Sequence, residues 1–386
     1  MSVDLLDLPH RGERLRDLAE MEGISLSSLA SELGIPSAKV QRLARGESPL
    51  PDDVVGVAMD RYGLPVTFFS AYPVSQDGAA VTFRKLSRSS ARSDKRVVRL
   101  FREAARMWRT ASERSGLPAA TVPTAEDRSD ATAADMAQLV READGLDDEA
   151  PVPNVIRLAE RFGVGVVLDL DPLLAPEPGD TGGHDHSGAS CPSRFEGRPL
   201  VVTVSPQPGA VTRMTVAHEL GHLVFDADLP ASPRPSDASE KRAFAFASAL
   251  LLPESMMRRR VSETTTLNSY LRIKADYGVS AGAIVVRAHK MGLISSKRAR
   301  SLHIQIASRG WRSNEPVPVP VEKPMLVSQA LQRAWPVNTV LAAATETGVK
   351  ADLITSWTDE QSSPTPTREH DNVISLTERR ALSNKG

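Results

Sequence analysis

The chain has 386 residues, of which 41% are hydrophobic and 25% charged, with a formal net charge of −1. This length predicts two to three domains, and the balanced charge by itself favours neither a nucleic-acid nor a membrane partner. Cys191 is the only cysteine, which excludes a disulfide framework and a cysteine-built zinc site, so we expect a spectator thiol. The start MSVDLLDLPHRGERL lacks a signal peptide, and no apolar run reaches about 18 residues. We therefore expect a cytoplasmic protein with no membrane partner.

Residues 10–75 predict an all-α N-terminal domain. Ser25 is a helix cap, Gly34 ends the following helix, and Ile35-Pro36 makes a turn into the next one. The expected helices cover 13–22, 26–33, 38–44 and 51–62. A helix, a short turn and a second helix form a helix-turn-helix, whose second helix enters the major groove of DNA. The stretch ISLSSLASELGIPSAKVQRLARGESPLP resembles the Cro/repressor-type (Xre-like) helix-turn-helix domain.

That resemblance implies double-stranded DNA as a partner of the second helix. The candidates for DNA contact are Ser37, Lys39, Gln41, Arg42 and Arg45. Residues 37–45 contain three basic side chains and no acidic one. Residues 1–75, however, hold 7 Lys+Arg and 11 Asp+Glu, a net charge of −4, whereas phosphate binding favours positive charge. A helix-turn-helix used only for protein contact is therefore the alternative.

The next segment, residues 81–118, predicts a basic connecting helix. Residues 81–116 hold 11 Lys+Arg and 3 Asp+Glu, a net charge of +8. Apolar residues recur there at helical spacing: Val97, Leu100, Phe101, Ala104, Ala105 and Trp108. The segment could contact phosphates, but the pattern favours a solvated helix whose apolar stripe docks on the following domain. A linker is expected over 118–129.

Residues 130–310 predict a domain of helices with a small sheet, so the whole chain is expected to be mainly α with a small β-sheet (α+β). The expected strands cover 163–170 and 199–204, and the expected helices outside the motif below cover 134–143, 153–162, 267–277, 281–291 and 296–308. Residues 172–192, rich in Pro, Gly and Asp, predict a loop. His184 and His186 lie in that loop, and we do not expect them to bind a metal.

The motif that organises this domain is TVAHELGHLVF, residues 215–225. His218 and His222 are four residues apart, which places both imidazoles on one helix face, as a zinc site of the H-E-x-x-H type requires. Glu219 lies about 100° round the helix, where it can act as general base on metal-bound water. Gly221 lowers helix propensity by about 0.8–1.0 kcal/mol relative to Ala. We therefore expect another segment to approach this glycine closely.

A catalytic zinc site needs a third protein ligand and an open position. Glu240 lies 18 residues after His222, in the first turn of a helical pattern over 240–253. We expect it to be the third ligand. The alternative is a carboxylate that only stabilises the positive end of its helix.

AHELGHLVF followed by E-x-x-A-x-x-F-A-x-x-L-L-x-P resembles the ImmA/IrrE family of metallo-endopeptidases, as does YGVSAGAIVVRAHKMGLIS. The resemblance implies Zn²⁺ on His218, His222 and Glu240, with Glu219 as catalytic base. Phe244 departs from the family, which commonly has Asn or Asp there to support a histidine ligand by a hydrogen bond.

From Pro316 the composition changes. PVPVPVEKP predicts a Pro-rich linker, and residues 322–358 a small helical region anchored by Leu331, Leu341 and Leu353. Residues 361–386 predict a disordered tail.

Together these patterns predict a DNA-binding transcriptional regulator whose zinc metallo-endopeptidase domain cleaves a partner repressor. The alternatives are a regulator whose zinc domain only senses a ligand or metal, and a toxin–antitoxin or prophage component. A homodimer is left open. Tyr270, Tyr277 and His289 are candidates for oxyanion stabilisation. The loop 226–239 is expected to gate access to the metal.

Overall fold

The computed structural model describes residues 9–72, 82–85, 90–125, 132–174, 186–190, 198–226 and 237–358. Within these ranges the chain is mainly helical with one small sheet, which confirms the predicted fold class. None of the helices in these ranges is long and apolar enough to cross a membrane. The tail 361–386, Cys191, His184 and most of the loop 226–239 lie outside the described residues.

The N-terminal unit consists of α1 (Arg14–Met21), α2 (Leu26–Glu32), α3 (Ser37–Leu43) and α4 (Asp52–Tyr62). Ser25 caps α2 as predicted, because its Oγ accepts a hydrogen bond from the backbone N–H of Ser28 at 3.0 Å. Gly34 has a φ of +69°, a left-handed conformation that favours glycine and turns the chain towards α3. The predicted sequence of helix, turn and helix is therefore present.

Within the described residues, four short strands form the sheet in the order β1-β3-β4-β2. They are β1 (Thr82–Lys85), β2 (Gly165–Val167), β3 (His186–Ser190) and β4 (Leu200–Thr203). β2 runs parallel to β4, whereas β3 is antiparallel to both β4 and β1. The prediction of a loop over 172–192 was wrong for β3. His-Ser-Gly-Ala-Ser lacks the β-branched run of a strand, but the backbones of β1 and β4 pair with it on both sides.

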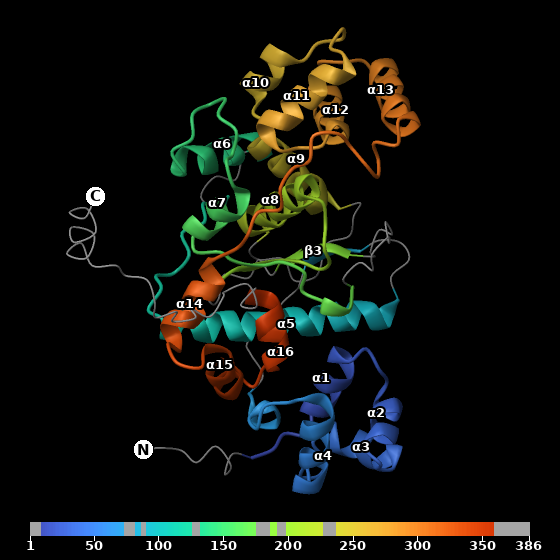
Figure 1. Cartoon of the computed structure of the whole chain (residues 1–386), viewed down its shortest axis with the longest axis vertical. Helices are drawn as coiled ribbons and strands as arrows, with labels where there is room; N and C mark the ends of the chain where they lie inside the picture. Colours follow the sequence, from blue (N-terminus) through green and yellow to red (C-terminus); the bar gives the residue numbers. More distant parts are fainter. Residues whose placement is uncertain are drawn as a thin grey trace, which may run out of the picture.

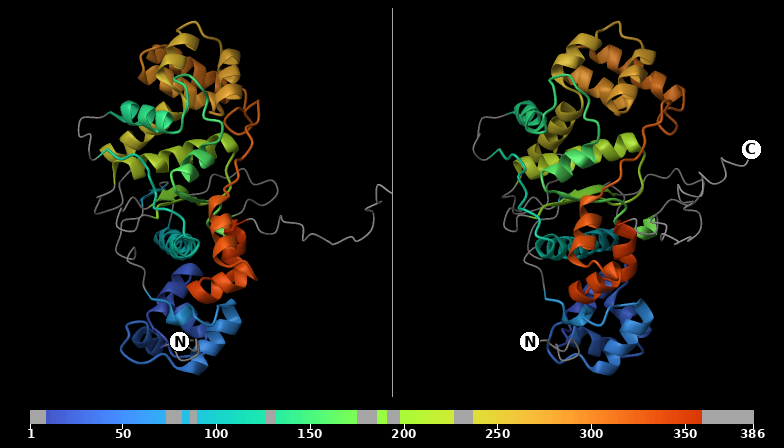
Figure 2. Two further views of the ribbon diagram at one scale, coloured as in Figure 1. Left: turned by 90° about the vertical axis from the view of Figure 1, so that its left-hand side faces the viewer. Right: turned by 60° about the vertical axis from the view of Figure 1, so that its left-hand side comes forward.

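The sheet separates two layers of helices (Figures 1 and 2). The long α5 (Ala91–Arg114) covers one face and α8 (Gly209–Phe225) the other. Alternate residues of β4 follow this division, since Leu200 and Val202 join the core around α5 while Val201 joins the core around α8. Trp108 lies so close to Gly165 that a Cβ there would approach its ring to 2.8 Å.

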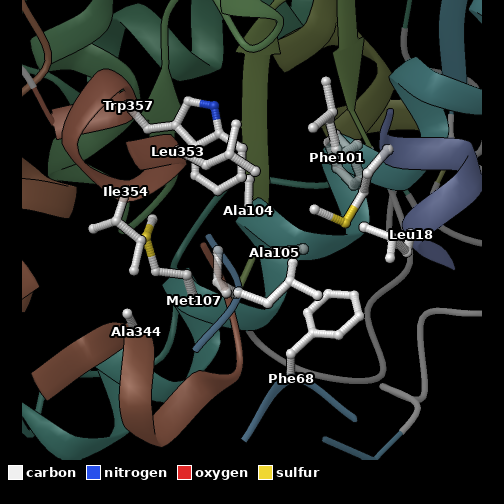
Figure 3. Packing of buried hydrophobic residues seen from close by; sticks show 14 of the residues in the cluster. Leu18, Phe68, Phe101, Ala104, Ala105, Met107, Ala344, Leu353, Ile354 and Trp357 are labelled. Carbon is white, nitrogen blue, oxygen red and sulfur yellow. The ribbon is translucent and has the colours of Figure 1, made fainter. Parts of the chain in front are cut away.

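The basic helix α5 is buried, which corrects the expectation of a solvated helix. It lies between the N-terminal unit and the sheet. Its Phe101 belongs to one core with Leu18 and Phe68 of the N-terminal unit (Figure 3). Its charged side chains are neutralised inside this contact. Glu103 is fully buried and binds Arg14 of α1 at 2.7 Å, and Arg99 binds Asp17 at 2.6 Å. Arg14 of the N-terminal unit thus neutralises an acid of α5, and Arg99 of α5 neutralises an acid of the N-terminal unit.

The C-terminal helices return to the same core (Figure 3). They are α14 (Leu326–Ala334), α15 (Thr339–Thr347) and α16 (Ala351–Thr358). Leu331 and Leu353 are buried as predicted, but Leu341 is 63% exposed, so its prediction as an anchor was wrong. α15 instead buries Ala343, Ala344 and Thr347, and at about 100° per residue the middle of this buried face lies about 110° round the helix from Leu341.

The remaining helices form a second core on the α8 side of the sheet. They are α6 (Ala133–Ala143), α7 (Val155–Arg161), α9 (Ala238–Leu251), α10 (Glu254–Arg260), α11 (Leu267–Tyr277), α12 (Ala281–Lys290) and α13 (Ser296–Ser308). α9 crosses next to α8, and α10 to α13 lie beyond it at the end of the molecule opposite α1 to α4 (Figure 1).

Candidate metal centre

The centre lies where α8 and α9 meet. Val216, Leu220 and Val224 of α8 are buried in the second core, which fixes the rotation of the helix. Gly221 lies against α9, where an added Cβ would come within 3.1 Å of the Cα of Ala243 and of the Phe246 ring. This confirms the close approach expected at Gly221, and it brings Glu240 in the first turn of α9 to the histidines of α8.

His218, His222 and Glu240 direct their ligand atoms to one point. The two Nε2 atoms are 3.2 Å apart, and each lies 3.3 Å from a carboxylate oxygen of Glu240. All three side chains are buried, with 4% or less of each residue exposed. Bonds of 2.0–2.1 Å to a tetrahedral ion place its ligand atoms about 3.3–3.4 Å apart. The three side chains therefore fit one metal ion, as the spacing in the sequence predicted.

Glu219 lies beside this group on α8 and is almost fully buried. Ser190, the last residue of β3, donates a hydrogen bond to its Oε2 at 2.6 Å. Burial raises the pKa of the Glu219 carboxyl above its ordinary value, against the lowering effect of His222 and His218. Ser190 was missed from the sequence, because its segment was expected to be a loop and carries no motif.

His222 has a carboxylate partner on the side away from Glu240. Its Nδ1 lies 2.6 Å from Oδ2 of Asp226, the residue just after α8. Ser239 and Arg242 each donate a hydrogen bond of 2.5 Å to Asp226, which fixes the position of that carboxylate. A carboxylate of this kind orients a ligand imidazole and sets its tautomer. Asp226 was also missed, although its position four residues after His222 on the same helix face was a usable signal.

His218 differs from His222 in the surroundings of its Nδ1 atom. The ring of Phe244 lies edge-on to it with 4.6 Å between the ring centroids. Within the part of the chain that the structure describes, the buried Nδ1 of His218 has no hydrogen-bond acceptor. This is the outcome expected where Phe replaces Asn or Asp.

The surroundings of the three residues considered for oxyanion stabilisation are as follows. The Tyr277 hydroxyl donates to the backbone oxygen of Glu149 at 2.6 Å, and Nδ1 of His289 lies 3.3 Å from the backbone oxygen of Ile294. Tyr270 is buried in the second core, where its hydroxyl has no partner among the described residues. Burial raises the pKa of Tyr270, so its hydroxyl stays protonated.

The predicted DNA-contact residues lie on and after α3. Gln41 and Arg42 are exposed, whereas Ser37 and Lys39 are half-buried. Arg45 follows the helix and binds the carboxylate of Glu47 through Nε at 2.5 Å and through an Nη at 3.1 Å. Among the five, Gln41 and Arg42 are therefore the side chains best placed to reach an external surface.

Comparison with known families agrees with this geometry. Residues 182–289 match the IrrE N-terminal-like domain, the M78 peptidase family. The match begins just before β3 and includes β4, α8 and α9, and so contains Ser190, Glu219 and the three metal-binding candidates. No curated protein matches the chain. The segment 182–289 is thus a metallopeptidase-type domain, similar to the IrrE N-terminal-like domain and built around a buried His-His-Glu cluster that can hold a metal ion.

Proposed function

We propose that the chain is a DNA-binding transcriptional regulator whose metallopeptidase-type domain is a zinc endopeptidase acting on a partner repressor. The spacing of His218, His222 and Glu240 is the observation that carries the peptidase part. Two imidazoles and one carboxylate at tetrahedral spacing suit Zn²⁺ and leave a fourth position for water. The three candidate ligands are buried, with 4% or less of each residue exposed.

The protein residues have separate tasks in this proposal. Bound zinc supplies a Lewis acid that lowers the pKa of its water and polarises a peptide carbonyl. Glu219 takes the proton of the attacking water and passes it to the leaving amine. Burial raises the pKa of Glu219 above its ordinary value, which favours its acceptance of a proton. Ser190 holds Oε2 and so orients the carboxylate.

The test compares wild type with Glu219→Gln and His222→Ala. Wild type and Glu219→Gln should each contain about one zinc ion per chain, because Glu219 is not a ligand, while His222→Ala should lose it. Cleavage of a co-encoded repressor-like partner should fall by about 10²–10⁴-fold in Glu219→Gln. Equal cleavage by wild type and Glu219→Gln would refute the mechanism, and zinc retention in both His222→Ala and Glu240→Ala would refute the site.

The DNA-binding part is supported by the order of α2, turn and α3 and by exposed Gln41 and Arg42. If Arg42 contacts a base edge, Arg42→Ala should weaken operator binding by about 1–3 kcal/mol and relax specificity. If it contacts only phosphate, all sequences should weaken alike, and the salt slope should fall by about one unit. Arg61→Ala on α4 is the control, because Arg61 is exposed but paired with Glu32. Unchanged binding after replacing Lys39, Gln41 and Arg42 together would favour a helix-turn-helix that contacts only protein.

A non-cleaving sensor is the second candidate, and one observation favours it. Among the described residues, Nδ1 of His218 lacks the hydrogen-bond partner that His222 has, and such partners typically strengthen metal binding by about 10–100-fold. A weaker site suits a protein that responds to metal supply. A partner that is captured but not cut by the zinc-loaded chain, together with DNA binding that changes with zinc concentration, would support the sensor over the peptidase.

A further inference from the structure

The edge of the sheet next to the metal centre is formed by β1. β3 carries Ser190, whose hydroxyl binds Glu219, and β3 packs against α8. On its other side β3 pairs with β4, so among the described strands only β1 covers the side of β3 away from β4, and that side would be a free edge without it. A free strand edge presents unpaired N–H and C=O groups, to which an extended peptide can add as a further strand.

The register places one end of β1 at the catalytic group. Thr82 pairs with Ser190, Phe83 with Ala189 and Lys85 with His186 in antiparallel orientation. Because Ser190 Oγ lies 2.6 Å from Oε2 of Glu219, the backbone of Thr82 is at the end of β1 nearest the metal centre. A peptide occupying the position of β1 would therefore run along β3 and reach the centre opposite Ser190.

β1 comes from another part of the chain than the strand that it covers. In the sequence, β1 lies between the N-terminal unit and α5. It is therefore outside the segment 182–289, which contains β3 and the metal-binding candidates. It is only four residues long, and its register shifts between Phe83 and Lys85. A short strand whose pairing shifts register part-way has few regular ladder bonds, so a competing strand can replace it at low cost.

We infer that the edge of β3 is the binding surface for an extended segment of the protein substrate, and that β1 blocks this edge as an internal competitor. The assignment of the β3 edge to a protein substrate rests on the proposed peptidase function. The pairing of a peptide with β3 does not itself require a metal. The substrate class is a peptide segment that pairs antiparallel with β3 through its main chain. Full activity then requires that β1 leave the edge.

The experiment uses the full chain carrying Glu219→Gln, so that a bound peptide is not cut. Phe83→Pro with Arg84→Pro should release β1, because consecutive amides of a strand point to opposite edges and one of the two must face β3. Phe83→Ala with Arg84→Ala is the matched control, since it removes the same side chains but keeps both amides. The probe is a fluorescent acetylated peptide Val-Thr-Phe-Arg-Lys-Leu, the sequence of residues 81–86.

Anisotropy measures peptide affinity, and hydrogen exchange measures protection of residues 186–190. If β1 covers the edge in nine molecules of ten, its release should tighten apparent binding by about tenfold. The proline variant should show faster exchange at 186–190, and the peptide should restore protection. The alanine control should stay near wild type. The inference would be overturned if the proline variant and wild type bound the peptide with equal affinity and residues 186–190 of wild type already exchanged rapidly.

Zinc content separates this inference from the proposed function. Absence of zinc from wild type would refute the peptidase proposal, while the exchange experiment would still report on the β3 edge. Should the proline variant fail to fold, the unaltered β1 provides a second test. Saturating peptide must then increase exchange at residues 82–85 while 186–190 stay protected, and unchanged exchange at 82–85 overturns the inference.

Discussion

At the scale of single residues, Asp226 determines how His222 meets a metal ion. Its carboxylate accepts from the His222 ring at 2.6 Å and is itself held by Ser239 and Arg242. We predict that Asp226→Asn lowers zinc affinity by about 10–100-fold, since the amide is a weaker acceptor and the ring loses its fixed tautomer. Competition with a chromophoric chelator measures this. Asp276→Asn, at a half-exposed ion pair with Arg260, is the control. Equal affinities in the two variants would leave Asp226 without a positioning role.

The metal cluster could be predicted at this scale because its signal is local. His218 and His222 meet through helix periodicity alone, and Glu240 follows from the next helical pattern. Ser190 could not be found in this way. Its role depends on β3 lying beside α8, and a strand of His, Ser, Gly and Ala has no pattern that distinguishes it from a loop. A residue such as Ser190, which strand pairing brings to the site, therefore could not be predicted from the sequence.

At the scale of elements, Glu103 fixes α5 to α1. The carboxylate is fully buried and contacts Arg14 and Arg106 at 2.7 and 3.4 Å. We predict that Glu103→Gln destabilises the protein by about 3–5 kcal/mol, because buried guanidinium groups lose their counter-charge. Glu113→Gln, on the same helix but half-exposed, should change stability by less than about 0.5 kcal/mol. Urea denaturation would measure both, and similar midpoints for the two variants would contradict the prediction.

The same carboxylate predicts a pH dependence. Burial alone would raise the pKa of Glu103, but Arg14 and Arg106 lower it to about 2 in the folded protein. A lowered pKa stabilises the fold above the unfolded value of about 4.3. This contribution is lost as pH falls towards about 2. Wild type should therefore lose more stability than Glu103→Gln between about pH 4.5 and 2. Parallel loss in both proteins would show that other groups control acid unfolding.

The charge of α5 shows what composition alone could not reveal. Residues 81–116 carry a net charge of +8, which taken alone indicates an exposed basic surface or a phosphate contact. In the structure Arg96 binds Asp171, while Arg99 binds Asp17 and Glu20 of α1. The acids that neutralise the helix lie far away in the sequence, so only the tertiary arrangement shows that these charges are internal.

At the scale of the whole molecule, the sheet divides two hydrophobic cores. One includes α1 to α5 with α14 to α16, and the other includes α6 to α13. We predict that Leu353→Ala in the first core and Leu302→Ala in the second each cost about 2–5 kcal/mol, because both side chains are buried. Hydrogen exchange should show the first variant loosening α1 and α5, and the second loosening α11 and α12. Uniform loosening by either variant would indicate a single cooperative unit.

This division also limits what the sequence could predict about the C-terminal helices. Their apolar spacing indicated helices, but not the surface that they cover. Thr67 of the N-terminal unit donates to the backbone oxygen of Thr345 at 2.5 Å, and Lys350 binds Glu22 at 3.1 Å. Contacts between residues about 280–330 positions apart carry no local signature, since neither partner has a distinctive spacing in its own segment.

Because Leu15 and Trp357 belong to one core, the N-terminal helices complete their packing only after α16 has been synthesised. α16 joins α1 to α4 only after nearly every other described element has left the ribosome. The segment 182–289 emerges earlier and has its own core around α8 to fold upon. Chains that end before α14 would therefore contain the metal-binding residues but lack part of the support for the helix-turn-helix. Translation order thus makes the synthesis of α14 to α16 a condition for a well-packed N-terminal unit.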